Sequence, residues 1–491
     1  MHWVDTLIIA LFMIGVFTAG SFLGRSVKNM KDYFSASNNL PWWSVMVSIV
    51  AAETSVLTFL SIPGVAFLGD FSFLQVCLGY IIGRILVALI FIPMYAKGNY
   101  ISVYEAVREK GGVTMQRIMS ITFMATRLLA DGVRLFAVAI PLSMITGLPY
   151  FHSLLILGFV TVAYTLMGGI RGVVWMDFAQ WIIYMSAAIV ALVIGLKMIP
   201  DLGTSVDILQ SLGKLQLIHL KGSGYTLWGG IIGGAMLSLA SHGTDQLIVQ
   251  RILSCKNTAD SKKAMIGSGI VVFIQFTFFL IIGAMLYMLF SQKMGIGDPR
   301  ELLAALNLTK PDELFTKFII ENLPPAVKGI TVAGIFAASM TTLSGSLSSM
   351  SSSITVDIFK PIFRHIDGDD KWLRISRITT LCWGLIMVFG AMIFTNQNSP
   401  LVEVGLSIAS FTYGGTLGMF VTVRFFKKCR LWQYVVPFFF SIAVMTFIIL
   451  AGWTGLFKVN WTLYTLIGVA SSVLMNRLLV WIKKPETASE I

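Results

Sequence analysis

The chain has 491 residues, of which 56% are hydrophobic and 12% are charged, and its formal net charge at pH 7 is +12. A typical soluble domain carries about 25% charged residues, so this balance excludes an ordinary soluble protein. About 20 consecutive apolar residues cross a bilayer. Such stretches recur from 4–23 to 460–481, which predicts a polytopic helical membrane protein.

Thirteen apolar stretches are long enough to be membrane spans. They lie near 4–23, 42–68, 72–96, 118–146, 150–168, 174–199, 226–250, 265–290, 327–356, 375–396, 401–423, 432–452 and 460–481. The longest loops, about 200–225 and 291–326, have room for short interfacial helices. Residues 1–485 are therefore expected to form one transmembrane domain, followed by a short cytoplasmic tail at 486–491.

The basic residues are distributed unevenly between the two sides of these spans. If the N-terminus lies outside, 24 of the 36 Lys and Arg residues fall in the inner segments and 9 in the outer ones. The remaining three, Arg84, Arg127 and Arg134, lie inside spans. The positive-inside rule then places the N-terminus outside and the C-terminus in the cytoplasm. The positive charge thus orients helices, and we expect no nucleic-acid partner.

Two of the spans are interrupted by polar residues at mid-depth. The second carries Glu53, Thr54, Ser55 and Thr58, and the seventh carries the run SHGTD at 241–245. Backbone leaves the helix at membrane depth only where it is buried in protein or lines a cavity. Matching interruptions in two halves of a chain point to an inverted-repeat transporter with its site at the breaks. Two helices with polar packing are the alternative.

The five-span separation of the breaks suits a five-plus-five inverted repeat. The expected parts are a leading span at 4–23, a first repeat at 42–199, a second repeat at 226–423 and trailing spans at 432–481.

At these residues the chain resembles the sodium/solute symporter family, which includes proline, sialic acid and sugar symporters. Four segments carry the resemblance: KDYFSASNNLPWW at 31–43, YTLMGGIRGVVWMDFAQ at 164–180, HGTDQLIVQRILSCKN at 242–257 and GIFAASMTTLSGSLSSMSSSITVDIFKP at 334–361. Their order and spacing strengthen the match. The resemblance implies an all-α fold of the leucine-transporter type with broken helices, and sodium-coupled symport by alternating access.

The resemblance also implies a principal sodium site between the second and ninth spans. Sodium is a hard cation that prefers oxygen ligands, by analogy with other hard ions. By motif match, the site takes carbonyl and hydroxyl oxygens of Ala51, Thr54, Ala338, Thr341 and Thr342.

Some family members have a second sodium site. Asp177, Thr341 and Ser344 fit it, although Gly345 stands where such members tend to offer another hydroxyl. A salt bridge from Asp177 to Arg171 is the alternative, and coupling ratios of one or two sodium ions both stay open.

The fourth span carries Arg127, Asp131 and Arg134 on one helix face, since their spacings are four and three. Ionisable residues inside a membrane mark function by default. The net charge of +1 leaves one guanidinium free to bind a carboxylate in bidentate fashion. This pattern favours a carboxylate-bearing or zwitterionic solute, such as an amino acid, a sialic acid or a monocarboxylate. A purely structural role, with Asp131 neutralising both arginines, is the alternative.

Other residues near the first break are expected to complete the solute site. Glu53 has three open roles: to bind sodium indirectly, to take a substrate amine, or to pair with Arg127 or Arg134. Cys77 stands where sugar- and sialic-acid-transporting relatives carry a polar residue, which weakens a sugar assignment. The predicted solute residues are Glu53, Ser55, Thr58, Phe73, Gln75, Asp131 and Arg134, while Asp245 and Gln246 are expected to gate.

These features together predict a sodium-coupled symporter of the plasma or bacterial inner membrane, working as a monomer in the lipid bilayer. Its partners are sodium and a small solute, and no covalent chemistry is required. A proton-coupled symporter with Glu53 or Asp131 as the carrier, a sugar or polyol symporter, and a transport-like sensor are the alternatives. An intramembrane enzyme is disfavoured, because the spans carry no hydrolase motif and the four cysteines show no metal or redox spacing.

Overall fold

The computed structural model describes residues 2–24, 27–98, 100–147, 149–220, 225–393, 401–426 and 429–482. Across these ranges the regular structure is helical, apart from one isolated backbone bridge between Leu40 and Cys255. The predicted tail at 486–491 lies outside the described residues.

The described part of the first half of the chain contains ten α-helices. They are α1 (Trp3–Gly24), α2 (Met30–Ser35), α3 (Trp42–Glu53), α4 (Val56–Leu68), α5 (Leu74–Ile90), α6 (Ile92–Tyr95), α7 (Glu105–Thr146), α8 (Tyr150–Lys197), α9 (Leu202–Ser211) and α10 (Leu227–Gly243).

The described residues of the second half form ten more α-helices. They are α11 (Gln246–Leu253), α12 (Thr258–Met294), α13 (Pro299–Ala305), α14 (Glu313–Asn322), α15 (Val327–Ser353), α16 (Lys360–Ile362), α17 (Asp369–Gly390), α18 (Leu401–Phe425), α19 (Trp432–Trp453) and α20 (Tyr464–Ile482). A π-helical turn, Ile354–Phe359, joins α15 to α16.

Several of these helices can cross a membrane. In the described part of the chain, eight helical segments are long and apolar enough, or nine if the bent pair of α3 and α4 is one span. The predicted spans 150–168 and 174–199 form the single helix α8, which bends at Gly169, where φ is +54°. The predicted number of thirteen is compatible with this arrangement and stays a prediction.

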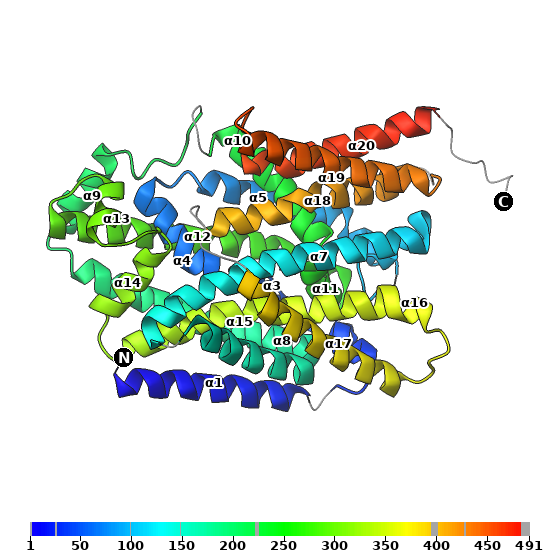
Figure 1. Cartoon of the computed structure of the whole chain (residues 1–491), viewed down its shortest axis with the longest axis horizontal. Helices are drawn as coiled ribbons and strands as arrows, with labels where there is room; N and C mark the ends of the chain where they lie inside the picture. The colour runs from blue at the N-terminus through cyan, green and yellow to red at the C-terminus, as the bar shows by residue number, and fades with distance from the viewer. Residues whose placement is uncertain are drawn as a thin grey trace.

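The short helices outside the spans lie where the sequence left room for them. Helix α9 falls in the loop at 200–225, and α13 and α14 fall in the loop at 291–326. This confirms the expectation of short helices in these loops. They gather at the end of the molecule where α1 begins, and α20 ends at the opposite end (Figure 1).

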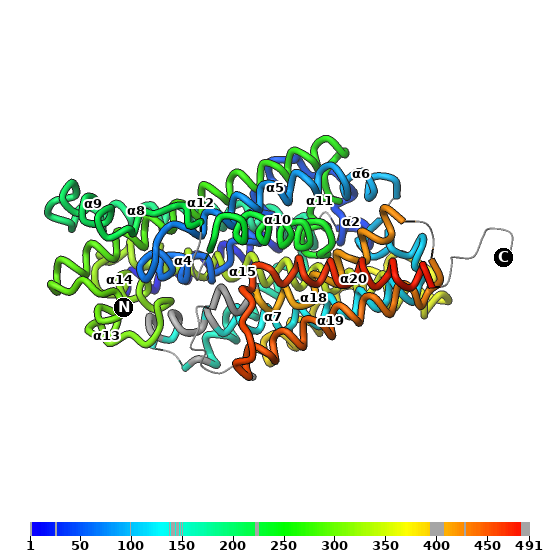
Figure 2. Tube along the Cα trace, turned by 90° about the horizontal axis from the view of Figure 1, so that it is seen from above, coloured from blue at the N-terminus to red at the C-terminus, as the bar shows by residue number. Residues whose placement is uncertain are grey.

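Helix α15 forms the centre of the molecule, and nearly all of its side chains are buried. Seen from above, α5, α10 and α12 lie toward one edge of the molecule, while α7, α18 and α19 lie toward the other (Figure 2). Small residues permit such close helix contacts. At Gly234 of α10, for example, a Cβ atom would lie 2.2 Å from the carbonyl oxygen of Val76 on α5.

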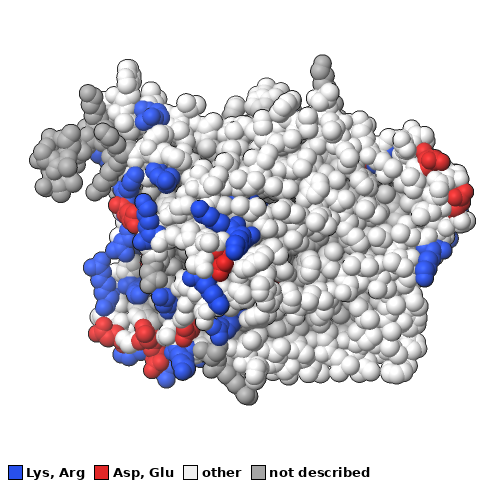
Figure 3. Space-filling view, turned by 180° about the vertical axis from the view of Figure 1, so that it is seen from behind, with Lys and Arg blue, Asp and Glu red and all other residues white. Residues whose placement is uncertain are grey.

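The surface agrees with a molecule that sits in a bilayer. A broad middle band in the space-filling view carries almost no charged side chain, and Lys and Arg gather at the end where α20 ends (Figure 3). An apolar band of this kind is stable against lipid and would be unusual against water.

Candidate functional site

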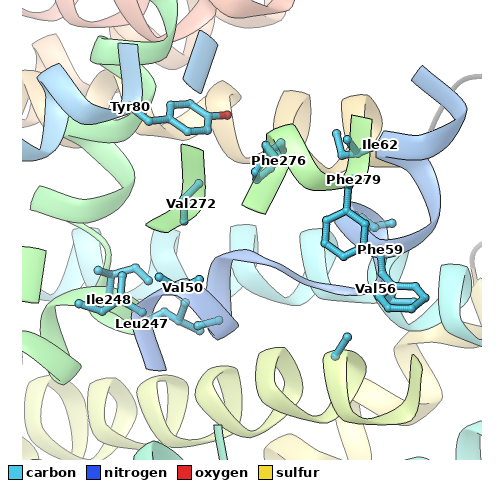
Figure 4. Packing of buried hydrophobic residues seen from close by; sticks show 14 of the residues in the cluster. Val50, Val56, Phe59, Ile62, Tyr80, Leu247, Ile248, Val272, Phe276 and Phe279 are labelled. Carbon is cyan, nitrogen blue, oxygen red and sulfur yellow. The ribbon is translucent and has the colours of Figure 1, made fainter. Parts of the chain in front are cut away.

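The second predicted span is broken, as expected. Helix α3 stops at Glu53, α4 begins at Val56, and the two axes differ by 61°. The backbone amide of Ser55 bonds to the carbonyl of Glu53 at 2.9 Å rather than to Ala51 four residues back. Ser55 then starts α4 by accepting the amide of Leu57 on its side chain at 3.2 Å. Figure 4 shows the extended link between Val50 and Val56.

The freed carbonyls of this break face two hydroxyls of α15. Thr341 Oγ1 lies 3.1 Å from the carbonyl oxygen of Ala51 and 3.0 Å from that of Ala338. Thr342 Oγ1 lies 3.5 Å from the carbonyl oxygen of Ala52. Thr54 is fully buried beside them, with its hydroxyl unpartnered among the described residues. These neutral oxygens form a donor set that suits a hard monovalent cation.

Part of the remaining hydroxyl run on α15 bonds to neighbouring helices. Ser348 accepts the side-chain amide of Gln250 at 3.2 Å, and Ser352 accepts that of Gln246 at 3.0 Å. Ser351 lies 2.6 Å from the hydroxyl of Thr379. The run therefore divides into one part at the break and one part that packs against α11 and α17.

Asp177 pairs with an arginine other than the one considered above. Its Oδ2 accepts Arg251 Nη2 at 2.9 Å and Ser48 Oγ at 2.5 Å, and both members of the ion pair are fully buried. The suggested partner Arg171 was therefore wrong. The guanidinium lies against Gly345, where a Cβ atom would be 2.5 Å from Nη2. Asp177 Oδ1 has no hydrogen-bond partner among the described residues.

Glu53 pairs with Arg84, so its suggested pairing with Arg127 or Arg134 was wrong. Arg84 Nη2 contacts Glu53 Oε2, and Arg84 Nη1 donates to Ser268 at 2.8 Å. His242 Nε2 lies 3.5 Å from the same carboxylate oxygen. His242 stands near the end of α10, just before a second break that separates α10 from α11. This cluster therefore joins the break between α3 and α4 to the break between α10 and α11.

The fourth-span triad gains a fourth member from the second break. Arg134 Nη1 donates to Asp131 Oδ1 at 2.6 Å, and Arg127 Nη1 lies 3.7 Å from the same oxygen. Arg127 Nη2 donates to Asp245 Oδ2 at 2.5 Å. Because Asp245 neutralises Arg127, the net charge of +1 expected from the triad alone is cancelled.

Arg134 borders two cavities. One of about 80 Å³ is lined by Arg134 together with Glu53, Ser241, His242 and Tyr413. The other, of about 10 Å³, is lined by Arg134 with Asp131, Ser55, Ser339 and Thr342. Arg134 Nε is buried and has no hydrogen-bond partner among the described residues. A guanidinium with an open donor thus lies between the break and the larger cavity.

The other predicted solute residues fall into two groups. Ser55 lines the smaller cavity. Thr58 is buried in the first turn of α4 and lines neither of the two cavities. Phe73 stacks on Phe276, with ring centroids 5.4 Å apart, and Gln75 donates to the carbonyl of Tyr225 at 2.7 Å. Phe73 and Gln75 belong to an aromatic layer rather than to the walls of these two cavities.

The comparisons with known proteins agree with this architecture. The model of the "Sodium:solute symporter family" matches residues 33–430. The chain belongs to this family. It is a multi-pass membrane transporter that couples a solute to sodium, and not an enzyme.

The individual relatives share only modest sequence identity with this chain. The sodium/sialic acid symporter NanT of Aliivibrio fischeri is 26% identical over 483 residues, covering 96% of this chain and 92% of that protein. The human sodium/iodide cotransporter is 24% identical over 409 residues, covering 82% of this chain and 62% of that protein. A solved structure of a sodium-coupled sialic acid symporter covers 99% of both chains, with a TM-score of 0.86 and 22% identity. This likeness confirms the leucine-transporter-type fold.

Sequence reasoning missed three site residues: Arg84, Arg251 and Tyr413. The sequence did hold a signal for Arg84, because an arginine inside a span must pair with a buried acid. Glu53 lies in the preceding predicted span and was an available partner. Arg251 was assigned to a loop, where a positive charge needs no partner. Tyr413 offered no signal, since one tyrosine in an apolar span is ordinary.

Proposed function

We propose that this symporter carries a small solute with a carboxylate group, bound by Arg134. The observation behind the proposal is the unpartnered Nε of Arg134 at the border of the two cavities. A guanidinium binds a carboxylate through two parallel hydrogen bonds, which makes it selective for that group. Two relatives support an anion, because their names specify sialic acid and iodide.

We assign the sodium ion to the first break. Its ligands would be the carbonyls of Ala51, Thr54 and Ala338 and the hydroxyls of Thr341 and Thr342. The distances of 3.0 and 3.1 Å from Thr341 Oγ1 to two of those carbonyls support this assignment. Ser55 and Thr342 line the cavity that reaches Arg134, so sodium and solute would lie close together. Sodium would then hold α3 and α15 together and favour solute binding, and linkage makes this coupling reciprocal.

The charges around the cavity favour one sodium ion per carboxylate. Arg84, Arg127 and Arg134 are matched by Glu53, Asp131 and Asp245. A carboxylate and one sodium ion add no net charge to this balanced set, and unbalanced charge in a membrane is costly. A second sodium ion at Asp177 and Ser344 stays a prediction that the Arg251 ion pair disfavours, since Asp177 is already neutralised.

A zwitterionic solute is the second candidate. Glu53 lines the larger cavity together with Arg134, and its side chain is 18% exposed, so it could receive an amine. Because Glu53 already pairs with Arg84 and His242, a carboxylate solute without an amine is the better match.

The proposed orientation follows the positive-inside rule. Lys and Arg gather at the end of the molecule where α20 ends (Figure 3), which supports a cytoplasmic C-terminus and an outer N-terminus in a plasma or bacterial inner membrane. Since the residues of each proposed site come from one chain, we propose that a monomer in lipid is sufficient for transport.

The test is a thermal-shift assay on the purified protein in sodium or potassium chloride. The panel contains N-acetylneuraminate, lactate, pyruvate, an amino acid and a neutral sugar. At least one of the carboxylates should raise Tm in sodium chloride but not in potassium chloride. Arg134→Ala should lose that shift and keep the shift caused by sodium. Arg134→Lys retains the charge without the bidentate geometry and should bind more weakly. An unchanged solute shift in Arg134→Ala would refute the solute assignment.

The coupling ratio needs a separate measurement in proteoliposomes. Uptake should depend on sodium with a Hill coefficient near one and should not respond to an imposed membrane potential. A sigmoidal sodium dependence with potential-driven uptake would show a second ion.

A further inference from the structure

A third cavity lies next to the larger solute cavity. It measures about 20 Å³ and is lined by Tyr104, Phe123, Thr126, Thr244 and Asp245 among others. Arg127, Ala409 and Tyr413 line both this cavity and the larger solute cavity, so they form the wall between them. Tyr104, the residue just before α7, lines the third cavity, and α7 begins at the end of the molecule where α20 ends (Figure 1). The α7 residues in its wall, Phe123, Thr126, Arg127 and Ala130, come from the middle of that helix. We call it the inner cavity, and its connection to the cytoplasm rests on the orientation proposed above.

The carboxylate of Asp245 connects Arg127 and Tyr413 in this wall. Asp245 Oδ2 accepts Arg127 Nη2 at 2.5 Å and the hydroxyl of Tyr413 at 2.5 Å. The three residues come from α7, α18 and the break between α10 and α11. Asp245 Oδ1 also accepts the amide of Leu247 at 2.9 Å and so starts α11. Any movement of α11 away from α7 therefore has to break this carboxylate's bonds to Arg127.

Arg127 has a second acid within reach. Asp131 Oδ1 lies 3.7 Å from Arg127 Nη1, but it is held more closely by Arg134 at 2.6 Å. Asp131 Oδ2 has no hydrogen-bond partner among the described residues. The four charges form a row in the order Arg134, Asp131, Arg127 and Asp245, from the solute cavity to the wall.

We propose that Arg127 is the gating residue of this symporter, and that it exchanges Asp245 for Asp131 when a solute carboxylate binds Arg134. The proposal rests on the solute assignment made above. A carboxylate on Arg134 competes with Asp131 for the guanidinium, which leaves Asp131 free to pair with Arg127. Asp245 then loses its ion pair, and α11 can move away to connect the solute cavity with the inner cavity.

The exchange avoids the main cost of opening a buried gate. Removing one partner from a buried ion pair leaves an uncompensated charge, which strongly destabilises the structure. In this row Arg127 always has an acid beside it, and Asp245 becomes exposed to the water of the opened path. A ligand shifts such an equilibrium only by its differential affinity for the two states, and the Arg134–Asp131 contact supplies that difference.

The experiment measures access to the inner cavity with a reporter cysteine. Thr416 lines this cavity and lies outside the charge row, so Thr416→Cys is introduced after the four native cysteines are replaced by alanine. Inside-out vesicles then expose the proposed cytoplasmic face to a membrane-impermeant maleimide. The labelling rate is compared with and without the panel carboxylate that gives the largest Arg134-dependent thermal shift.

The first arm contains no solute. Asp245→Asn and the milder Tyr413→Phe should both label faster than the parent, while each keeps its sodium-dependent thermal shift as evidence of folding. Tyr104→Phe removes a hydroxyl from the same cavity, and Glu321→Gln removes an acid from the Lys317 ion pair elsewhere. Both controls should label at the parent rate. Parent-like rates in Asp245→Asn and Tyr413→Phe would overturn the gate.

The second arm adds the carboxylate. It should accelerate labelling of the parent by about 5-fold or more, the lower end of typical coupling between sites. Asp131→Asn should bind the carboxylate more tightly, because Asp131 no longer competes for Arg134, but its labelling should not accelerate. Equal acceleration in the parent and in Asp131→Asn would overturn the exchange. If no panel carboxylate gives an Arg134-dependent shift, the solute assignment fails, and the first arm still decides the gate.

Discussion

The two helix breaks of this protein are built alike and lined differently. In both, the second half of the span begins at a side chain that accepts the amide two residues later: Ser55 accepts Leu57 at 3.2 Å, and Asp245 accepts Leu247 at 2.9 Å. The first break presents neutral carbonyls to two hydroxyls of α15. The second presents a carboxylate to Arg127.

This difference matches two different tasks. A site that takes up and releases a sodium ion works best with neutral oxygens, because a full negative charge would have to stay buried after the ion leaves. A gate needs contacts that are strong when formed and can be exchanged for others, which ion pairs with alternative partners provide. Glu53 and His242 link the two breaks at 3.5 Å.

The largest expected effect is on sodium binding at the neutral break. Thr342→Ala removes one hydroxyl, and since each ligand of a small cation replaces hydration, we expect the sodium-dependent rise in Tm and sodium-driven uptake to be lost. Thr342→Ser keeps the hydroxyl and should retain most of the response. Ser349→Ala, which removes a hydroxyl that donates to the carbonyl of Ser346 within the same helix, serves as the control. A full sodium response in Thr342→Ala would remove the basis of the comparison.

A large effect on stability is expected where the two breaks meet. Arg84→Met leaves the Glu53 carboxylate without its fully buried partner. Loss of one member of a buried ion pair costs about 3–5 kcal/mol, and the partial exposure of Glu53 should place this variant at the lower end. The double variant Glu53→Gln with Arg84→Met should recover much of that loss. Chemical denaturation in detergent would measure both, and a double variant no more stable than the single one would contradict the pairing.

The smallest effect concerns the C-terminal end of α4. Lys214 Nζ donates to the carbonyls of Phe67 and Gly69 at 2.7 and 3.3 Å, where a helix end favours a cation. Burial nevertheless lowers the pKa of Lys214 from 10.5 to about 8, although Asp70 and Asp298 oppose the shift. Between about pH 8 and pH 10.5 the unfolded chain binds more protons at Lys214 than the folded protein does. The contribution of Lys214 to stability therefore rises with pH in this range.

The matching measurement compares the protein with Lys214→Met. The difference in Tm between the two should shift in favour of Lys214 as pH rises from 7 to 9.5. A difference that stays constant would show that the pKa of Lys214 is not lowered in the folded protein.

Much of the fold could be predicted because its signals are local. Apolar length marks the spans, and polar residues at mid-depth marked the break at Thr54 and Ser55, which the structure confirms. The oxygens of Thr341 and Thr342 were found through motif resemblance, and the structure brings them to the carbonyls of Ala51 and Ala52. The role of these residues in sodium binding stays a prediction.

The charge pairs were predicted poorly, for a physical reason. Helical spacing correctly put Arg127, Asp131 and Arg134 on one face, since those contacts lie within one helix. The partners of Glu53 and Asp177 come from other helices, and spacing along the chain says nothing about which helices touch.

The sequence by itself determined the membrane environment, the helical class and the place of the first break. These properties depend on composition and on neighbours within a few residues. Only the tertiary structure decided which acid neutralises which arginine, because a buried charge pairs with whatever helix packing brings within about 4 Å. That choice turned the fourth-span triad into a balanced row ending at Asp245, which is the basis of the proposed gate.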